Sequence, residues 1–177
     1  RSLGMEAAAE AFGRDQRAIE EAAALGKPWY DPSFEGPAAI GDARLASYVA
    51  AWLRPHELAA PYASLLGSAP CAGALEQGPL ADCWFLGALS TVVAHHGVAS
   101  ILGNTRCMHS GAFIFRFFKG GAEVLVAVDG RLPCSNDRLP AFARCLGDAG
   151  ALWAPLAEKA YAKLHGSYAC LGEGAEA

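Results

Sequence analysis

The chain has 177 residues, of which 53% are hydrophobic and 18% charged, enough for one domain with a buried core and too apolar for general disorder. Its net charge of -4, with no basic cluster, gives no electrostatic case for binding nucleic acid. No apolar stretch reaches about 18 residues without a polar interruption, so no membrane span is expected.

The cysteines are expected to be free thiols. They form no Cys-x-x-Cys pair and follow no secretory signal, which favours a reducing, cytoplasmic (intracellular) location, with a disulfide framework as the alternative. The chain begins at Arg1 rather than Met, so we expect an excised or internal piece of a longer protein. The cysteines are Cys71, Cys83, Cys107, Cys134, Cys145 and Cys170.

Strong helix formers dominate residues 5–25, and Gly26-Lys27-Pro28 ends this pattern. We interpret residues 1–26 as a lead-in or anchor helix that packs lightly on the domain. Prolines and glycines interrupt residues 31–42, which predicts a loop. Residues 43–53 are a short helix or an irregular segment, and His56 after them is interpreted as a surface or capping residue.

The next stretch, residues 77–97, predicts a turn followed by a buried helix. Gly78-Pro79 favours the turn, and an apolar run continues from Trp84 to Val93, too long for an ordinary strand. We expect a helix over residues 82–96, with Asp82 as its N-cap and Gly97 as its C-terminal stop.

Cys83 would lie in the first turn of this helix, where free N–H groups favour the negative charge of a thiolate, the nucleophilic form. The competing interpretation is a small core residue, which is commoner for cysteines in apolar runs. The Gln77 carboxamide before the turn could fold back so that it and the Cys83 N–H donate to an oxyanion. The sequence thus predicts a reactive thiol at Cys83.

His95 and His96 cannot serve this thiol as a base. They follow Cys83 by twelve and thirteen residues, which is roughly 18 Å along a straight helix. We interpret them as residues that suit the negative end of the helix dipole.

Residues 112–118 and 123–129 are rich in β-branched and aromatic residues and flank the turn 119–122, which predicts an antiparallel hairpin. Phe113, Phe115 and Phe117 share one face and are interpreted as core. Asp129 is interpreted as a turn residue rather than a functional acid.

Residues 132–150 are predicted to be rich in loops, and an amphipathic helix follows them, with Pro155 in its first turn and Gly166 at its end. Lys159 and Lys163 are assigned to its solvated face without a role. The apolar face consists of Trp153, Leu156, Ala157, Ala160, Tyr161 and Leu164.

Residues 77–86, Gln-Gly-x-Leu-x-Asp-Cys-Trp-Phe-Leu, resemble the active-site segment of calpain-type cysteine proteases. Further blocks that resemble this family follow in the family's order, so the likeness covers about residues 15–172. These blocks are residues 29–34, 52–55, 128–133 and 156–168.

The resemblance implies an α+β fold, the first subdomain of a papain-like calpain core, with a central buried helix carrying the cysteine, a second amphipathic helix and a small antiparallel hairpin. It makes Cys83 the nucleophile and Gln77 an oxyanion-hole donor. The family's catalytic His and Asn come from a second half-core, which no segment here resembles. Residues 27–172 are therefore expected to be a half-core, and 173–177 a flexible tail toward the missing half.

The implied function is cysteine-type endopeptidase activity: limited proteolysis of protein substrates through a thioester, with the second half-core as partner. Because only one half is present, we expect no turnover by this chain alone. The alternative is a catalytically degenerate calpain-like module kept for binding or regulation.

Some positions depart from the family pattern. Ala81 replaces a usual Gly, which would cost about 1–2 kcal/mol if φ were positive. The acids that bind calcium in the family fall at Ala74 and Ala151, and an arginine linked to calcium-driven closure falls at Ala72. No cofactor is required by the sequence. Calcium is possible by resemblance, but a strong site is not expected, and Asp148 or Glu76 would substitute only through a loop shift.

Overall fold

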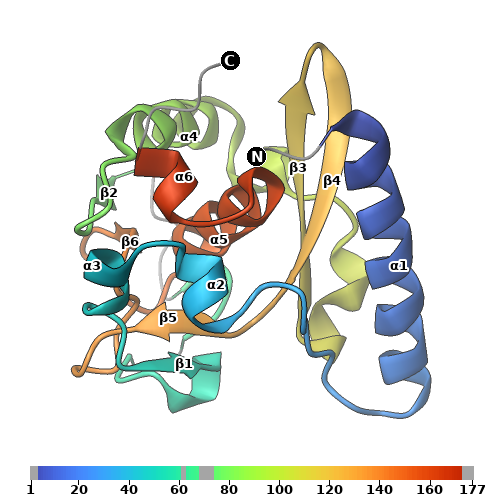
Figure 1. The fold of residues 1–177 in the computed structure, drawn as a ribbon, viewed down its shortest axis with the longest axis horizontal. Coiled ribbons are helices and arrows are strands. Elements are labelled where there is room, and N and C mark those ends of the chain that lie inside the picture. The colour runs from blue at the N-terminus through green and yellow to red at the C-terminus, as the bar shows by residue number, and fades with distance from the viewer. Residues whose placement is uncertain (1–3, 61–62, 68–73, 173–177) are drawn as a thin grey trace.

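A computed structural model describes residues 4–60, 63–67 and 74–172 (Figure 1). The α-helices are α1 (Met5–Ala24), α2 (Gly36–Ile40), α3 (Ala43–Ala46), α4 (Cys83–His96), α5 (Trp153–His165) and α6 (Ala169–Gly172). Short 3-10 helices are η1 (Pro55–Glu57), η2 (Val98–Ile101) and η3 (Thr105–Ser110). The strands are β1 (Ala51–Leu53), β2 (Leu75–Glu76), β3 (Ala112–Lys119), β4 (Ala122–Asp129), β5 (Leu132–Cys134) and β6 (Arg144–Cys145).

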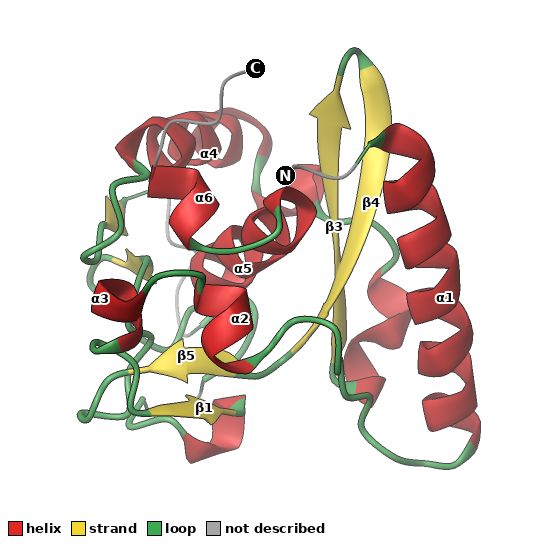
Figure 2. Ribbon diagram, viewed as in Figure 1, coloured by secondary structure: helices red, strands yellow, loops and turns green. Residues whose placement is uncertain are grey.

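The predicted hairpin is confirmed as β3 and β4, which pair antiparallel from Ala112↔Asp129 to Lys119↔Ala122. Gly120 and Gly121 form its turn with φ of 56° and 80°, the left-handed region that glycine adopts at little cost. The hairpin stands between α1 on one side and the other α-helices on the other (Figures 1 and 2). The aromatic stripe is buried as expected, and it packs toward the α5 side.

The helix buried at the centre is α5 rather than α4. Ten of the 13 residues of α5 are buried. In α4, only four of 14 are buried: Phe85, Leu86, Leu89 and Val93. The prediction of a buried helix around Cys83 therefore holds for one face only. An apolar run has no polar stripe to show which face packs inward, and the other face of α4 exposes apolar side chains such as Val92, which is 40% accessible.

Part of the predicted loop over residues 31–42 is helical. Pro37 lies in the first turn of α2, and Gly41, with φ of 79°, ends it. Of the residues interpreted as breakers (Pro32, Gly36, Pro37 and Gly41), Pro37 and Gly41 thus mark the ends of a short helix, which buries Ala39 and Ile40. Residues 43–53 contain α3 and then β1, which pairs antiparallel with β5.

The assignment of Lys159 to a solvated face is wrong. Its side chain is fully buried, and its Nζ donates to Asp129 Oδ1 at 2.6 Å and to the carbonyl oxygens of Asp129 and Arg131 at 3.0 and 2.6 Å. Asp129 also accepts the Arg131 N–H at 3.0 Å, so the predicted turn role is confirmed. What the sequence pattern missed is that the end of β4 covers this face of α5 and buries the charge.

Lys163, one turn later, is also not solvated: its side chain is 10% exposed. Its Nζ lies 2.7 Å from a carboxylate oxygen of Asp15 in α1 and 2.7 Å from one of Asp31. It also donates to the Ala127 carbonyl at 2.9 Å. The predicted helix over residues 5–25 is confirmed as α1, and besides burying Ile19 it is joined to α5 by this ion pair.

No helix within the described ranges is long and apolar enough to cross a membrane. Among the described cysteines, the free thiols include Cys83, Cys107, Cys134 and Cys170, and Cys71 lies outside the described ranges. Ala72 and the predicted tail over residues 173–177 also lie outside them.

Candidate functional site

Cys83 is the first residue of α4, as predicted, and it is exposed. Asp82 occupies the N-cap position, and its carbonyl accepts the N–H groups of Phe85 and Leu86 at 2.9 and 3.1 Å. Its carboxyl makes no capping hydrogen bond and is buried instead. The free N–H groups at the helix start are therefore left available around the Cys83 thiol.

Ala81 causes no left-handed strain. The only non-glycine residue with positive φ in the described parts of the chain is Arg138. The Cβ at position 81 therefore carries no cost of that kind, and the turn before α4 tolerates alanine.

Gln77 folds back over the turn toward the start of α4. Its side-chain Nε2 donates to the Leu80 carbonyl at 2.5 Å, which leaves the second N–H of the amide group available. Gly78 allows this close turn, because a Cβ there would lie 2.6 Å from the Phe142 Cα and 2.7 Å from the Phe142 carbonyl oxygen. The amide is thus held before the helix by a backbone packed directly on the loop at Phe142.

Trp84 joins the site to the rest of the domain. Its Nε1 donates to the Leu171 carbonyl of α6 at 3.1 Å, and its ring packs edge-on against Tyr161 of α5, with 5.9 Å between centroids. Phe85 stacks on the same tyrosine at 4.3 Å. The first turn of α4 is therefore fixed by aromatic contacts on its inner side while the Cys83 side remains open.

The sequence analysis missed a buried acid behind the site. Glu158 of α5 is 1% exposed and lies within hydrogen-bonding range of the Asp82 carboxyl. Burial and the neighbouring Asp82 carboxyl raise the pKa of Glu158 well above its ordinary value, and burial raises the pKa of Asp82. Nothing in the sequence pattern gave a signal for this pair, because 76 residues separate its members.

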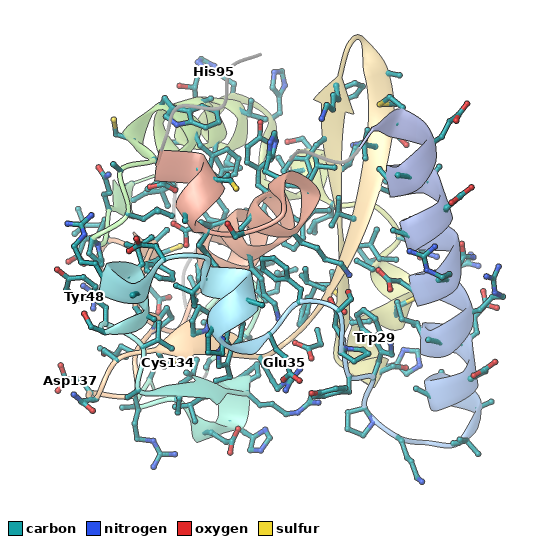
Figure 3. The ribbon with its side chains drawn as sticks, in the orientation of Figure 1. Trp29, Glu35, Tyr48, His95, Cys134 and Asp137 are labelled. Atoms are coloured by element: carbon teal, nitrogen blue, oxygen red, sulfur yellow. The ribbon has the colours of Figure 1, made fainter. Side chains whose placement is uncertain are left out.

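No described histidine hydrogen-bonds Cys83. His95 and His96 lie exposed at the far end of the helix that Cys83 begins, and Figure 3 labels His95 there. This position agrees with the prediction that they are not its base. A pocket of about 560 Å³ lined by Arg54, His56 and His109 lies beside the Pro55–Glu57 turn, and neither Cys83 nor Gln77 lines it.

Two positions of the calcium site that the resemblance implies lack their acids. Ala74 and Ala151 bring no side-chain oxygen, and Glu76 is in an ion pair with Arg144 at 2.8 Å. Asp148 Oδ1 accepts the Gly150 N–H at 2.9 Å. Within the described ranges, no three His, Cys, Asp or Glu side chains group in a way that could hold a metal ion.

Comparisons with known proteins identify the family of this chain. The model of the calpain family of cysteine proteases matches residues 29–177. The chain belongs to the calpain family. It is 36% identical to the calpain-2 catalytic subunit of Gallus gallus over 159 residues, which cover 84% of this chain and 22% of that protein.

Other calpains are similarly related. The calpain-type cysteine protease ADL1 of Oryza sativa subsp. japonica is 35% identical over 133 residues, or 71% of this chain and 6% of the relative. Calpain-10 of Mus musculus is 38% identical over 129 residues, or 70% of this chain and 19% of the relative. The chain therefore spans less than a quarter of each of these curated relatives. Its mixed helical and stranded architecture is consistent with an α+β calpain protease core.

Proposed function

We propose that this chain is the nucleophile-bearing half of a calpain-type cysteine endopeptidase that acts on protein substrates. The observation that carries the proposal is Cys83 itself: an exposed thiol at the first position of α4, with Gln77 folded toward the same helix start. The Cys83 thiolate attacks the scissile carbonyl carbon. The amine then leaves with a proton, and water hydrolyses the thioester that remains.

In this mechanism the Gln77 amide and the Cys83 backbone N–H donate to the developing oxyanion. A histidine must take the thiol proton and return it to the leaving amine, and an Asn or similar residue must orient that histidine. We assign both to a second half-core elsewhere in the longer protein, so the isolated chain has no turnover. We propose no strong calcium site in this half and an intracellular setting, where the free thiols stay reduced.

The first test is selective alkylation of the folded chain with iodoacetamide. The labelled cysteines are then identified by mass spectrometry of the digested peptides. Cys83 should react fastest. Cys107 is a half-exposed control. Cys134 is a buried control that should react slowest, because burial raises its pKa to about 12. Alkylation of Cys83 no faster than that of Cys107 contradicts the proposal.

The second test uses the longer protein with both halves. Cys83→Ala should abolish peptide hydrolysis, and Gln77→Ala should lower kcat by about 10²–10³-fold with little change in the stability of the domain. Hydrolysis by the isolated chain that Cys83→Ala removes would contradict the half-core assignment.

The competing function is a catalytically degenerate calpain module that binds or regulates. Two observations favour it: the Gln77 amide already donates to the Leu80 carbonyl, and the family's calcium acids are Ala74 and Ala151 here. Such a module in the longer protein would show no hydrolysis that depends on Cys83, even if the thiol is readily alkylated.

A further inference from the structure

Directly behind Cys83, two carboxyl groups meet in the interior. Asp82 is 0% exposed and Glu158 is 1% exposed, and the two side chains lie within hydrogen-bonding range of each other. Among the described residues, the Glu158 oxygens accept only the Ala143 N–H, at 3.2 and 3.1 Å, and no N–H or hydroxyl group donates to either Asp82 oxygen with hydrogen-bonding geometry. No lysine, arginine or histidine of the described chain forms an ion pair with this couple.

Two ionised carboxylates that lie in contact in the protein interior repel each other strongly, so one of them must keep its proton. A protonated carboxyl can donate to its neighbour, which also gives the otherwise unsatisfied Asp82 oxygens a donor. The raised pKa values of both groups, caused first by burial and for Glu158 next by Asp82, agree with this reading.

The surroundings offer no compensating charge. Tyr168 is the other titratable group that faces both acids; it is 0% exposed, and its pKa is raised well above the ordinary value by burial first and then by Glu158. Lys159 is the next residue on α5, but its ammonium is bound to Asp129, with 2.6 Å between Nζ and Oδ1. Cys83 itself is on the solvent side of the α4 start.

We propose that Asp82 and Glu158 share one proton and act as a positioning pair that holds the start of α4, and with it Cys83, against α5. Loss of this proton at higher pH leaves two buried negative charges side by side. The start of α4 then loosens, and its free N–H groups no longer hold fixed positions around Cys83. The effect on proteolysis rests on the proposed function, whereas the shared proton does not.

The sign of the pH effect follows from linkage. The folded pair keeps one proton that the unfolded chain has lost above the ordinary carboxyl pKa of about 4. The pair's contribution to stability is therefore complete below that pH and is lost as the pH rises through its raised folded pKa. Between these values, the folding equilibrium constant should fall about tenfold per pH unit relative to a variant without the shared proton.

The test compares the wild-type chain with Glu158→Gln, which keeps the shape and a hydrogen-bond donor but cannot release a proton. The ratio of their folding equilibrium constants, from urea titrations at several pH values, should show this tenfold dependence. The exposed Glu20→Gln is the matched control and should show none. A ratio that does not change with pH overturns the proposal.

Positioning is read from the ratio of the Cys83 to the Cys107 alkylation rate against pH. It should fall at alkaline pH in the wild-type chain and stay constant in Glu158→Gln, and equal profiles would exclude the positioning role. If the variant fails to fold, ¹³C NMR of the wild-type carboxyl carbons decides, because the carbons of Asp82 and Glu158 must report the same titration step above the ordinary carboxyl pKa, and its absence would overturn the proposal. Neither readout needs peptidase activity, so loss of the proposed function and loss of this inference are distinguishable.

Discussion

Lys159 shows at the residue scale how strongly one buried charge depends on its partner. Its ammonium has 0% exposure and lies 2.6 Å from Asp129 Oδ1. Replacing it with methionine leaves Asp129 buried without this cation, which should destabilise the domain by about 3–5 kcal/mol. Urea denaturation at pH 7 measures this loss, with the exposed Lys27→Met as the control expected to change stability by less than about 0.5 kcal/mol. A loss for Lys159→Met as small as that of the control would contradict this assignment.

The same aspartate should shape the acid side of the stability profile. Burial alone would raise the pKa of Asp129, but Lys159, the Asp31 N–H and Arg131 outweigh it and hold that pKa below its ordinary value. Its stabilising effect is therefore present above the ordinary carboxyl pKa of about 4 and is lost as the pH falls through the folded value. Asp129→Asn should flatten this acid decline in urea midpoints measured from pH 5 to 2. An unchanged slope would show that Asp129 does not titrate as argued.

Residue-level predictions succeeded where neighbours in sequence determine the structure. The position of Cys83 at a helix start follows from the turn at Gly78-Pro79 and the apolar run after it. Lys159 and Lys163 do lie on one face of α5, as their spacing requires, but what covers that face comes from segments about 30 residues or more away. The spacing of two residues along a helix shows that they share a face, but it does not show whether that face is exposed to solvent.

At the scale of elements, two glycines with free space around them make a matched pair. An added Cβ would meet nothing within 4 Å at either Gly87 or Gly121. Gly121 has φ of 80° in the hairpin turn, so Gly121→Ala should cost about 1–2 kcal/mol. Gly87 is inside α4, where alanine should instead stabilise by about 0.5–1 kcal/mol. Thermal denaturation followed by circular dichroism tests both, and shifts of the same sign would contradict the backbone argument.

The elements that could be predicted are those with a local signal. The hairpin, α1, α4 and α5 each follow from a period, a turn or a cap within their own residues. The β1–β5 pair could not be predicted, because it joins Trp52 to Pro133 across 81 residues, and neither strand is longer than three residues. The short helix α2 was missed because its Pro37 and Gly41 boundaries were read as breakers.

At the scale of the whole molecule, α4 separates a packed face from an open one. Val93 is 4% exposed and its neighbour Val92 is 40% exposed. In the isolated chain, Val93→Ala should lose about 2 kcal/mol, whereas Val92→Ala should change stability by less than about 0.5 kcal/mol. Urea denaturation measures both, and equal losses would mean that the open face is packed in solution.

The same face bears on the half-core proposal. If the second half-core covers it in the longer protein, Val92→Lys should lower peptidase activity there while leaving the isolated chain as stable as before. Full activity of that variant would place the second half elsewhere.

The hydrogen bond from Trp84 to Leu171 has one more consequence. Trp84 is 40% exposed and adjoins Cys83 in sequence, whereas Trp52 is half-buried and Trp29 and Trp153 are 3% and 0% exposed. Quenching by iodide should therefore act most strongly on the emission of Trp84. The fluorescence of Trp84 can therefore report ligand binding near Cys83 without an attached dye.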